Sequence, residues 1–395
     1  MTKINQAILF INHFALGLVA PVINLILLDH GATLKTLPLL YMIMAIAILC
    51  FEIPSGICAD LMGRKKIFII SCILNFMSFF LLIFVDNSLI LLITVIMLYG
   101  IGRAFSSGSL DALIIDQTIE LLGGDKIPMV TTRLAIMEGA GLSLGSIFGG
   151  LLAQVSTTHT SNLIIRSALI LVVLVLCLLF TKDEEKLSKE NKSPFSHIKY
   201  GLKPILTKGR FKFIIVGGFF IGLILSSLET YWQPAFEAIT TNDKSEWLLG
   251  FIASFGFLAV TVGNGIAQKF LEKYKTNHMI IYIMSRGILT CLIVIFALQK
   301  STIGFVAGYI SIYLLLGISN IAEATLINVY TPNHMRASVL SLYSFITQVG
   351  LMCAGLISYL AIEWIHFSGI WIITGSLLGG YILLVSSSVV RSKVK

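Results

Sequence analysis

Long apolar stretches alternate with short polar ones along almost the whole chain. About twelve of them have the length, roughly 20 residues, that an α-helix needs to cross the hydrocarbon core of a bilayer. They lack the alternation of apolar and polar residues at every second position that is typical of a membrane β-barrel. We therefore expect an all-α membrane protein. The predicted transmembrane helices cover residues 7–28, 36–59, 67–85, 89–112, 133–153, 163–181, 213–235, 246–268, 279–298, 302–329, 337–362 and 368–390.

The polar segment at residues 182–212 is the longest break in this pattern, and it divides the chain into two halves, residues 1–181 and 213–395. Its mixed charges are typical of a solvated linker. Polar positions of the first half recur in the second at one constant offset. This predicts two parallel six-helix bundles, a plan known from secondary transporters. The matching pairs are Asp60 and Glu272, Asp111 and Glu323, and Asp116 and Asn328.

The composition supports a membrane location and limits the partners. Hydrophobic residues make up 56% of the chain and charged residues 12%, against about 25% in soluble domains. If the amino terminus is cytoplasmic, about 22 of the 28 Lys and Arg residues fall on the cytoplasmic side and about three outside. We therefore expect a cell-membrane protein with both termini cytoplasmic and no nucleic-acid partner. The six cysteines lie in apolar runs without the spacing of a metal site, so we expect no bound metal.

The segment GICADLMGRKK, residues 56–66, lies between the second and third predicted helices. It resembles the loop signature of the Major Facilitator Superfamily, in which a glycine, a small residue and an aspartate precede glycine, arginine and lysine. The likeness covers the whole chain, because TPNHMRASVLSLYSF also resembles this family's entry into its eleventh helix. The resemblance implies a transporter that works by alternating access. The matching loop positions are Gly56, Ala59, Asp60, Gly63, Arg64 and Lys65.

The order of charges in this loop predicts a conformational latch on the cytoplasmic side. Asp60 can accept hydrogen bonds from the exposed N–H groups at the start of the eleventh helix, where the helix dipole stabilises a carboxylate by about 0.3–1 kcal/mol. Arg64 lies one helical turn further on and can pair with Asp116 at the cytoplasmic end of the fourth helix. The alternative interpretation is that these charges only orient two membrane helices.

A glycine-rich stretch, GAGLSLGSIFGG, lies inside the fifth predicted helix. No strand precedes it, so close packing between helices explains it better than phosphate binding. It resembles the fifth-helix signature of the exporters in this family, which favours antiport and efflux. The proline that usually follows the middle glycine is replaced by Ser146. The glycines predicted to pack are Gly141, Gly145, Gly149 and Gly150.

Three ionisable residues are predicted at one depth in the first half. With a rise of about 1.5 Å per residue and a core ~30 Å thick, Arg103 lies ~21 Å, Glu138 ~22 Å and Glu52 ~24 Å from the outer face. By the resemblance, Arg103 is the arginine that the family links to proton coupling, although Ser107 replaces an expected glycine. We predict that Arg103 with Glu52 or Glu138 couples transport to protons, with Asp111 as the next candidate. A permanent structural ion pair is the alternative.

Five polar or aromatic residues are predicted to line a substrate cavity. Two of them lie in the first helix, which lines the cavity in this family, and two lie near the outer end of the seventh. The fifth, on the tenth helix, is also a possible partner of Arg286. These residues are Asn12, His13, Glu229, Trp232 and Glu323.

Together these features predict a secondary active transporter rather than an enzyme. We expect a monomer in the lipid bilayer that uses inward proton flow to export small amphipathic compounds. A proton-coupled uptake symporter for a small nutrient is the alternative, and a polytopic membrane receptor or enzyme is the alternative from another class. No nucleotide-binding motif is present and no cofactor is expected. The identity of the small-molecule substrate does not follow from the sequence, because hydropathy does not determine how each helix is rotated.

Overall fold

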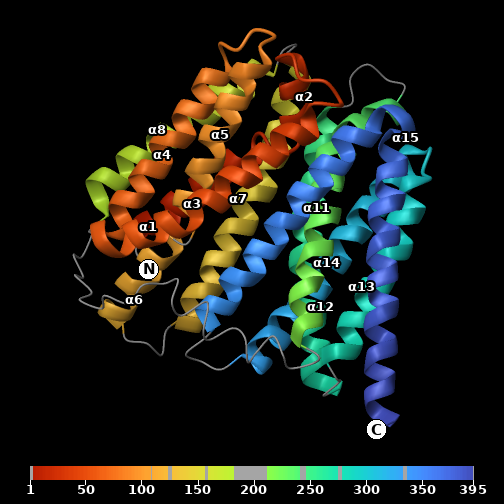
Figure 1. The fold of residues 1–395 in the computed structure, drawn as a ribbon. Coiled ribbons are helices and arrows are strands. Elements are labelled where there is room, and N and C mark those ends of the chain that lie inside the picture. Colours follow the sequence, from red (N-terminus) through yellow and green to blue (C-terminus); the bar gives the residue numbers. More distant parts are fainter. Residues whose placement is uncertain are drawn as a thin grey trace. The chain divides into compact units, whose positions relative to one another are not determined.

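The structure of the protein is a computed structural model that describes residues 3–107, 109–122, 127–155, 159–181, 211–240, 246–274, 278–331 and 336–394. Over these residues it is helical and contains no strand (Figure 1). Ten helical segments within them are long and apolar enough to cross a membrane. The expectation of an all-α protein with membrane-spanning helices is therefore confirmed, whereas the total of twelve helices stays a prediction.

The chain divides into two compact units. The first comprises Met1–Lys189 and Thr240–Phe257, and the second comprises Glu190–Ile239 and Leu258–Lys395. This division differs from the predicted halves at residues 240–257, which are part of the first unit. Most of the predicted linker, residues 182–210, lies outside the described residues.

The first unit contains eight described helices and the beginning of α12. Helix α1 packs against α7 and α8, α5 packs against α3 and α4, and α4 also contacts α8. Its apolar core joins side chains from α1, α4, α6, α7 and α8, including Leu9, Phe68 and Val173. The helices are α1 (Lys3–Gly17), α2 (Ile23–Asp29), α3 (Leu37–Met62), α4 (Arg64–Leu82), α5 (Leu89–Ser106), α6 (Ser109–Leu122), α7 (Ile127–Val155), α8 (Thr160–Phe180) and α12 (Glu246–Tyr274).

The first predicted transmembrane helix is interrupted between α1 and α2 around Pro21, which has no backbone N–H to donate to the carbonyl group one turn earlier. Two side chains of α8 bind carbonyl groups at this interruption. Arg166 donates from Nη1 to the carbonyl oxygen of Ala15 at 3.3 Å, and Asn162 donates from Nδ2 to that of Leu18 at 2.8 Å. The side chains of α8 thus satisfy backbone acceptors around the break between α1 and α2, as a membrane interior requires.

Arg166 is buried at this place, and no carboxylate of the described residues forms an ion pair with it. Its guanidinium carbon lies 3.6 Å from the centre of the Phe79 ring and 5.6 Å from that of Tyr99. The side chain is 3% exposed, and its Nε has no hydrogen-bond partner. Aromatic rings and backbone carbonyls therefore stabilise this charge.

In the second unit, α11 packs along α15, and α13 packs against α14 and α15. Helix α12 approaches α14 closely, because a Cβ atom at Gly317 would meet the carbonyl oxygen of Val260. The two last predicted transmembrane helices both lie within α15, as two helices that meet at a kink where His366 has non-helical angles (φ 56°, ψ 170°). Helix α12 continues into this unit from the first. The remaining helices are α11 (Phe211–Ile239), α13 (His278–Ala297), α14 (Thr302–Tyr330) and α15 (Arg336–Val394).

Candidate functional site

Two of the predicted residues meet in the first unit, where α1 contacts α7. The Nε2 atom of His13 lies 3.8 Å from Oε1 of Glu138. The other ring nitrogen, Nδ1, lies 2.9 Å from the carbonyl oxygen of Leu9. A carbonyl oxygen only accepts, so Nδ1 carries a hydrogen atom in this contact. The neutral imidazole therefore presents a bare Nε2 to Glu138, and only the protonated ring can donate a hydrogen bond to this carboxylate.

Asp111, in the first turn of α6, lies close enough to His13 for their charges to interact. The structure thus brings an acid from α6, a histidine from α1 and an acid from α7 into one neighbourhood. Glu138 is 53% exposed and His13 is 16% exposed. A charged carboxylate facing lipid costs about 2.5–3.5 kcal/mol, so this exposure indicates that Glu138 faces water. We call His13, Asp111 and Glu138 the acid–histidine cluster.

Arg103 lies elsewhere, in the last turn of α5. It interacts with Tyr99, one helical turn earlier, and Tyr99 also interacts with Arg166. Glu138 makes its ion pair with His13. Glu52 lies in α3, two residues before Pro54. Coupling between Arg103 and Glu52 stays a prediction. Sequence reasoning missed the partnership of His13 and Glu138, because one residue was assigned to the substrate cavity and the other to proton coupling.

The predicted latch begins at the junction of α3 and α4. Gly63 ends α3 with φ 93° and ψ 142°, a conformation that favours glycine, and α4 begins at Arg64. Lys65 donates from Nζ to the carbonyl oxygens of Thr181 at 2.6 Å and Leu178 at 3.1 Å, at the carboxyl end of α8. A cation there stabilises the end of the helix dipole. The side chains of Asp60 and Asp116 lie outside the described residues, and a Cβ at Gly56 would have no neighbour within 4 Å.

The glycines of α7 lie against neighbouring backbone. A Cβ atom at Gly141 would come within 2.8 Å of the carbonyl oxygen of Phe10 in α1. Cβ atoms at Gly145 and Gly149 would clash with the carbonyl oxygens of Phe14 and Leu18. A Cβ atom at Gly150 would lie 2.7 Å from Cα of Gly250 in α12. The absence of side chains at these positions therefore permits α7 to approach α1 and α12 at backbone distance.

Ser146 stands in this stretch where the exporters' signature has proline. It is fully buried, and its hydroxyl group donates to the carbonyl oxygen of Leu142 at 2.8 Å. Proline at this position would remove a backbone N–H and so leave a carbonyl of the preceding turn without its helical partner. The serine keeps the helical N–H and adds a second donor to that carbonyl.

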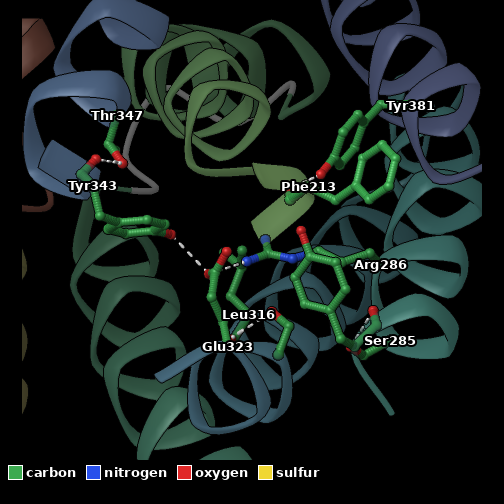
Figure 2. Close-up of polar contacts among 10 residues, drawn as sticks. Phe213, Ser285, Arg286, Leu316, Glu323, Tyr343, Thr347 and Tyr381 are labelled. Atoms are coloured by element: carbon green, nitrogen blue, oxygen red, sulfur yellow. Dashed lines mark hydrogen bonds and ion pairs between the residues drawn. The ribbon is translucent and has the colours of Figure 1, made fainter. Parts of the chain in front are cut away.

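A buried ion pair joins three helices of the second unit (Figure 2). Arg286 of α13 donates from Nη2 to Oε2 of Glu323 on α14 at 2.6 Å, and the Tyr343 hydroxyl group of α15 donates to the same oxygen at 2.7 Å. The side chain of Arg286 is fully buried and that of Glu323 is 4% exposed. Oε1 of Glu323 and both Nε and Nη1 of Arg286 have no hydrogen-bond partner. The partnership with Arg286 was anticipated from the sequence, whereas the role of Tyr343 was not.

Glu229 lies in α11 among aromatic side chains. The Tyr313 hydroxyl group donates to its carboxylate. The ring centres of Trp232 and Tyr309 are 4.8 Å apart, and those of Tyr309 and Tyr313 are 4.6 Å apart. Trp232 is 1% exposed. It is therefore packed within the second unit, and its place in a substrate cavity stays a prediction.

No group of three His, Cys, Asp or Glu side chains in the described part of the chain is arranged to hold a metal ion. The chemistry available at these clusters is thus proton binding, ion pairing and aromatic contact. Such clusters inside membrane helices mark the paths of substrates and ions.

Comparisons with known proteins show the family to which the chain belongs. A sequence profile of the Major Facilitator Superfamily matches residues 7–355. An uncharacterised MFS-type transporter of Bacillus subtilis (strain 168), YxaM, is 24% identical over 356 residues, which cover 87% of this chain and 84% of YxaM. The nucleoside transporter NupG has a similar fold with a TM-score of 0.80 and 14% identity, over 98% of this chain and 99% of NupG.

A second similar fold is that of a POT family transporter, solved in complex with a thioalcohol-conjugated peptide. The TM-score is 0.77 and the identity 14%, over 98% of this chain and 96% of the transporter. Because the family profile matches most of the residues, and because the helices have the length and hydropathy of membrane spans, the chain is a multi-pass membrane transporter that belongs to the Major Facilitator Superfamily.

Proposed function

We propose that this protein is a proton-coupled secondary transporter that exports small amphipathic compounds. The observation that carries the proposal is the acid–histidine cluster of His13, Asp111 and Glu138. Its two acids and one histidine come from three helices. A single proton changes the contact between Nε2 of His13 and Glu138 from unfavourable to favourable.

This change gives the proton a means of altering helix packing. With a neutral His13, the lone pair of Nε2 faces a carboxylate at 3.8 Å. When His13 is protonated, the ring carries two N–H groups and a positive charge that attracts both Glu138 and Asp111. Proton binding therefore draws α1, α6 and α7 together, and proton release loosens them. A transporter couples two fluxes when one ligand shifts its conformational equilibrium in this way.

The direction of transport is inferred from the glycines of α7. They resemble the signature of the family's exporters, and in the structure they lie at backbone distance from α1 and α12. Uptake of a small nutrient is the second candidate. It is favoured by the similarity of fold to the nucleoside transporter NupG. Asn12 of α1 is proposed as a substrate contact in the first unit, and Glu229 of α11 is a separate candidate in the second.

The alternating conformations require an element that closes the cytoplasmic side. We assign this role to the latch of Asp60, Arg64 and Asp116, following the loop signature. Asp60→Asn is expected to weaken closure without preventing insertion into the membrane. Cysteine crosslinks across the cytoplasmic side that form equally often in the wild type and in Asp60→Asn would argue against the latch.

The test of the proposed function is flux in proteoliposomes with an imposed pH gradient, measured against a panel of lipophilic cations and nucleosides. We expect a gradient with acid on the extravesicular face of right-side-out vesicles to drive efflux of an amphipathic member of the panel. A pH-sensitive dye would record proton movement in the opposite direction. Efflux of nucleosides alone would change the substrate class, and uptake along the gradient would establish the symporter.

The matched variants are Glu138→Gln and Glu363→Gln. Both exchange one exposed carboxylate for an amide, but Glu363 lies on α15 in the second unit, whereas the acid–histidine cluster belongs to the first. We expect Glu138→Gln to lose gradient-driven transport and to keep substrate exchange, whereas Glu363→Gln should behave as the wild type. If Glu138→Gln and His13→Asn both move protons at the wild-type ratio, the cluster is not the coupling site.

A further inference from the structure

A second histidine lies between two carboxylates, in a place that the proposed function does not use. His159 precedes α8 and has a left-handed backbone conformation with φ 53°. Its Nδ1 atom lies 2.6 Å from Oδ2 of Asp29, the last residue of α2. Its Nε2 atom lies 3.6 Å from Oε1 of Glu246, the first residue of α12. The imidazole is 6% exposed, so both contacts form in a largely buried place.

The two contacts respond differently to a proton. A neutral imidazole has one N–H group, and the short distance to Asp29 places it on Nδ1. The lone pair of Nε2 then faces the carboxylate of Glu246, which repels it. A protonated imidazole donates from both nitrogens and carries a positive charge between two negative ones. The contact with Asp29 therefore persists in both states, while the contact with Glu246 is favourable only when His159 is protonated.

The first turns of α12 are also held to α7 by neutral contacts. The backbone N–H of Trp247 donates to Oε1 of Gln154 at 3.4 Å. A Cβ atom at Gly250 would lie 2.5 Å from the carbonyl oxygen of Ser146. These contacts bring Glu246 to His159 without depending on pH, so the charge of His159 adds to or subtracts from an existing association.

We propose that His159 is a proton-binding site that, when protonated, clamps the beginning of α12 to α2 and α8. The site goes beyond the proposed function, which places the transported proton at the acid–histidine cluster. In the predicted topology the clamp lies at the outer face. Because α12 runs from the first unit into the second, the clamp acts on a helix that both units share. An acidic exterior thus favours the clamped arrangement.

Other titratable or charged residues also lie in this region of the chain. His30 follows Asp29, but its Nδ1 contacts the carbonyl oxygen of Ile26 at 2.8 Å, within its own helix. Gln154 of α7, which contacts the backbone of Trp247, is uncharged. Asp243 and Lys244 precede Glu246 in the chain and lie outside the described residues. The described charges that lie against His159 are those of Asp29 and Glu246.

The test measures the distance between α8 and α12 as a function of pH. Nitroxide labels on Ile164→Cys and Trp247→Cys, two exposed positions, report this distance in the full-length protein without native cysteines, reconstituted in nanodiscs. We expect stronger dipolar broadening at pH 5 than at pH 8. His159→Gln should abolish the difference, and His30→Gln, the control, should retain it.

Glu246→Gln provides an independent outcome. The amide group of glutamine can donate to the bare Nε2 of neutral His159, so the clamp should stay closed at both pH values. If His159→Gln elutes as an aggregate, the pH response of Glu246→Gln still tests the proposal. A wild-type spectrum that is the same at pH 5 and pH 8 overturns the proposal, as does an unchanged pH response in His159→Gln or in Glu246→Gln. Because no substrate or gradient is present, this result is independent of the flux experiment.

Discussion

The buried ion pair of the second unit permits a quantitative test. Glu323→Gln keeps the size of the side chain and removes its charge, which leaves the guanidinium of Arg286 buried without compensation. Removing one partner of a buried pair typically costs about 3–5 kcal/mol. The 2.6 Å distance and the burial of both side chains favour the full value. At about 3 °C per kcal/mol, we therefore expect the apparent Tm in detergent to fall on the order of 9–15 °C.

Replacement of the whole network should be much milder. In the triple variant Arg286→Met, Glu323→Met and Tyr343→Phe, no charge is left buried and no hydroxyl group loses its acceptor. Hydrophobic replacements of complete buried pairs are often neutral or stabilising. We expect the apparent Tm of the triple variant to lie within about 3 °C of the wild type, corresponding to roughly 1 kcal/mol. The difference from the sum of the single effects measures the coupling.

The assay is thermal unfolding at a fixed scan rate, followed by the reaction of buried cysteines with a thiol-reactive dye. Glu363→Gln on α15 is the matched control, because it removes an exposed carboxylate and should leave the Tm unchanged. The reasoning is wrong if Glu323→Gln lowers the Tm by no more than this control does. It is also wrong if the triple variant falls by the sum of the single variants, since the three side chains would then not act as one network.

Three further predictions concern the first unit. Gly145→Val should prevent the close approach of α7 to α1 and lower the apparent Tm by several degrees. Gly265→Ala is the control and should leave the Tm unchanged, because a Cβ atom there has no neighbour within 4 Å. An equal loss of Tm in the two variants would contradict the packing of α7. Arg166→Met should lower the Tm, because the hydrogen bonds of Arg166 to two backbone carbonyl groups and its stacking on the Phe79 ring are lost. An unchanged Tm would show that these contacts do not stabilise the break between α1 and α2. In intact cells, an impermeant maleimide should label Lys35→Cys and not Lys65→Cys, and labelling of the latter would overturn the orientation.

Much of the architecture follows from the linear pattern alone. A bilayer requires every backbone N–H and C=O group to find a partner within the chain, so a stretch of about 20 apolar residues implies a helix whatever surrounds it. The close approach of α7 to its neighbours was also foreseeable from Gly141, Gly145 and Gly149, because a helix face without side chains allows the backbones of two helices to come into contact. The pairing of Arg286 with Glu323 was also foreseeable, since a charge buried in a membrane protein is stabilised when it pairs with an opposite charge.

Other features depend on how the helices are rotated and packed, which hydropathy does not determine. The first helix was predicted as continuous over residues 7–28, and only the structure shows that it is broken around Pro21 and that side chains of α8 bind the carbonyl groups there. The contacts of His13 with Glu138 and of His159 with Asp29 join residues more than 100 positions apart. Local pattern reflects burial and the membrane, whereas these pairings depend on which faces of distant helices meet, and only the tertiary structure decides that.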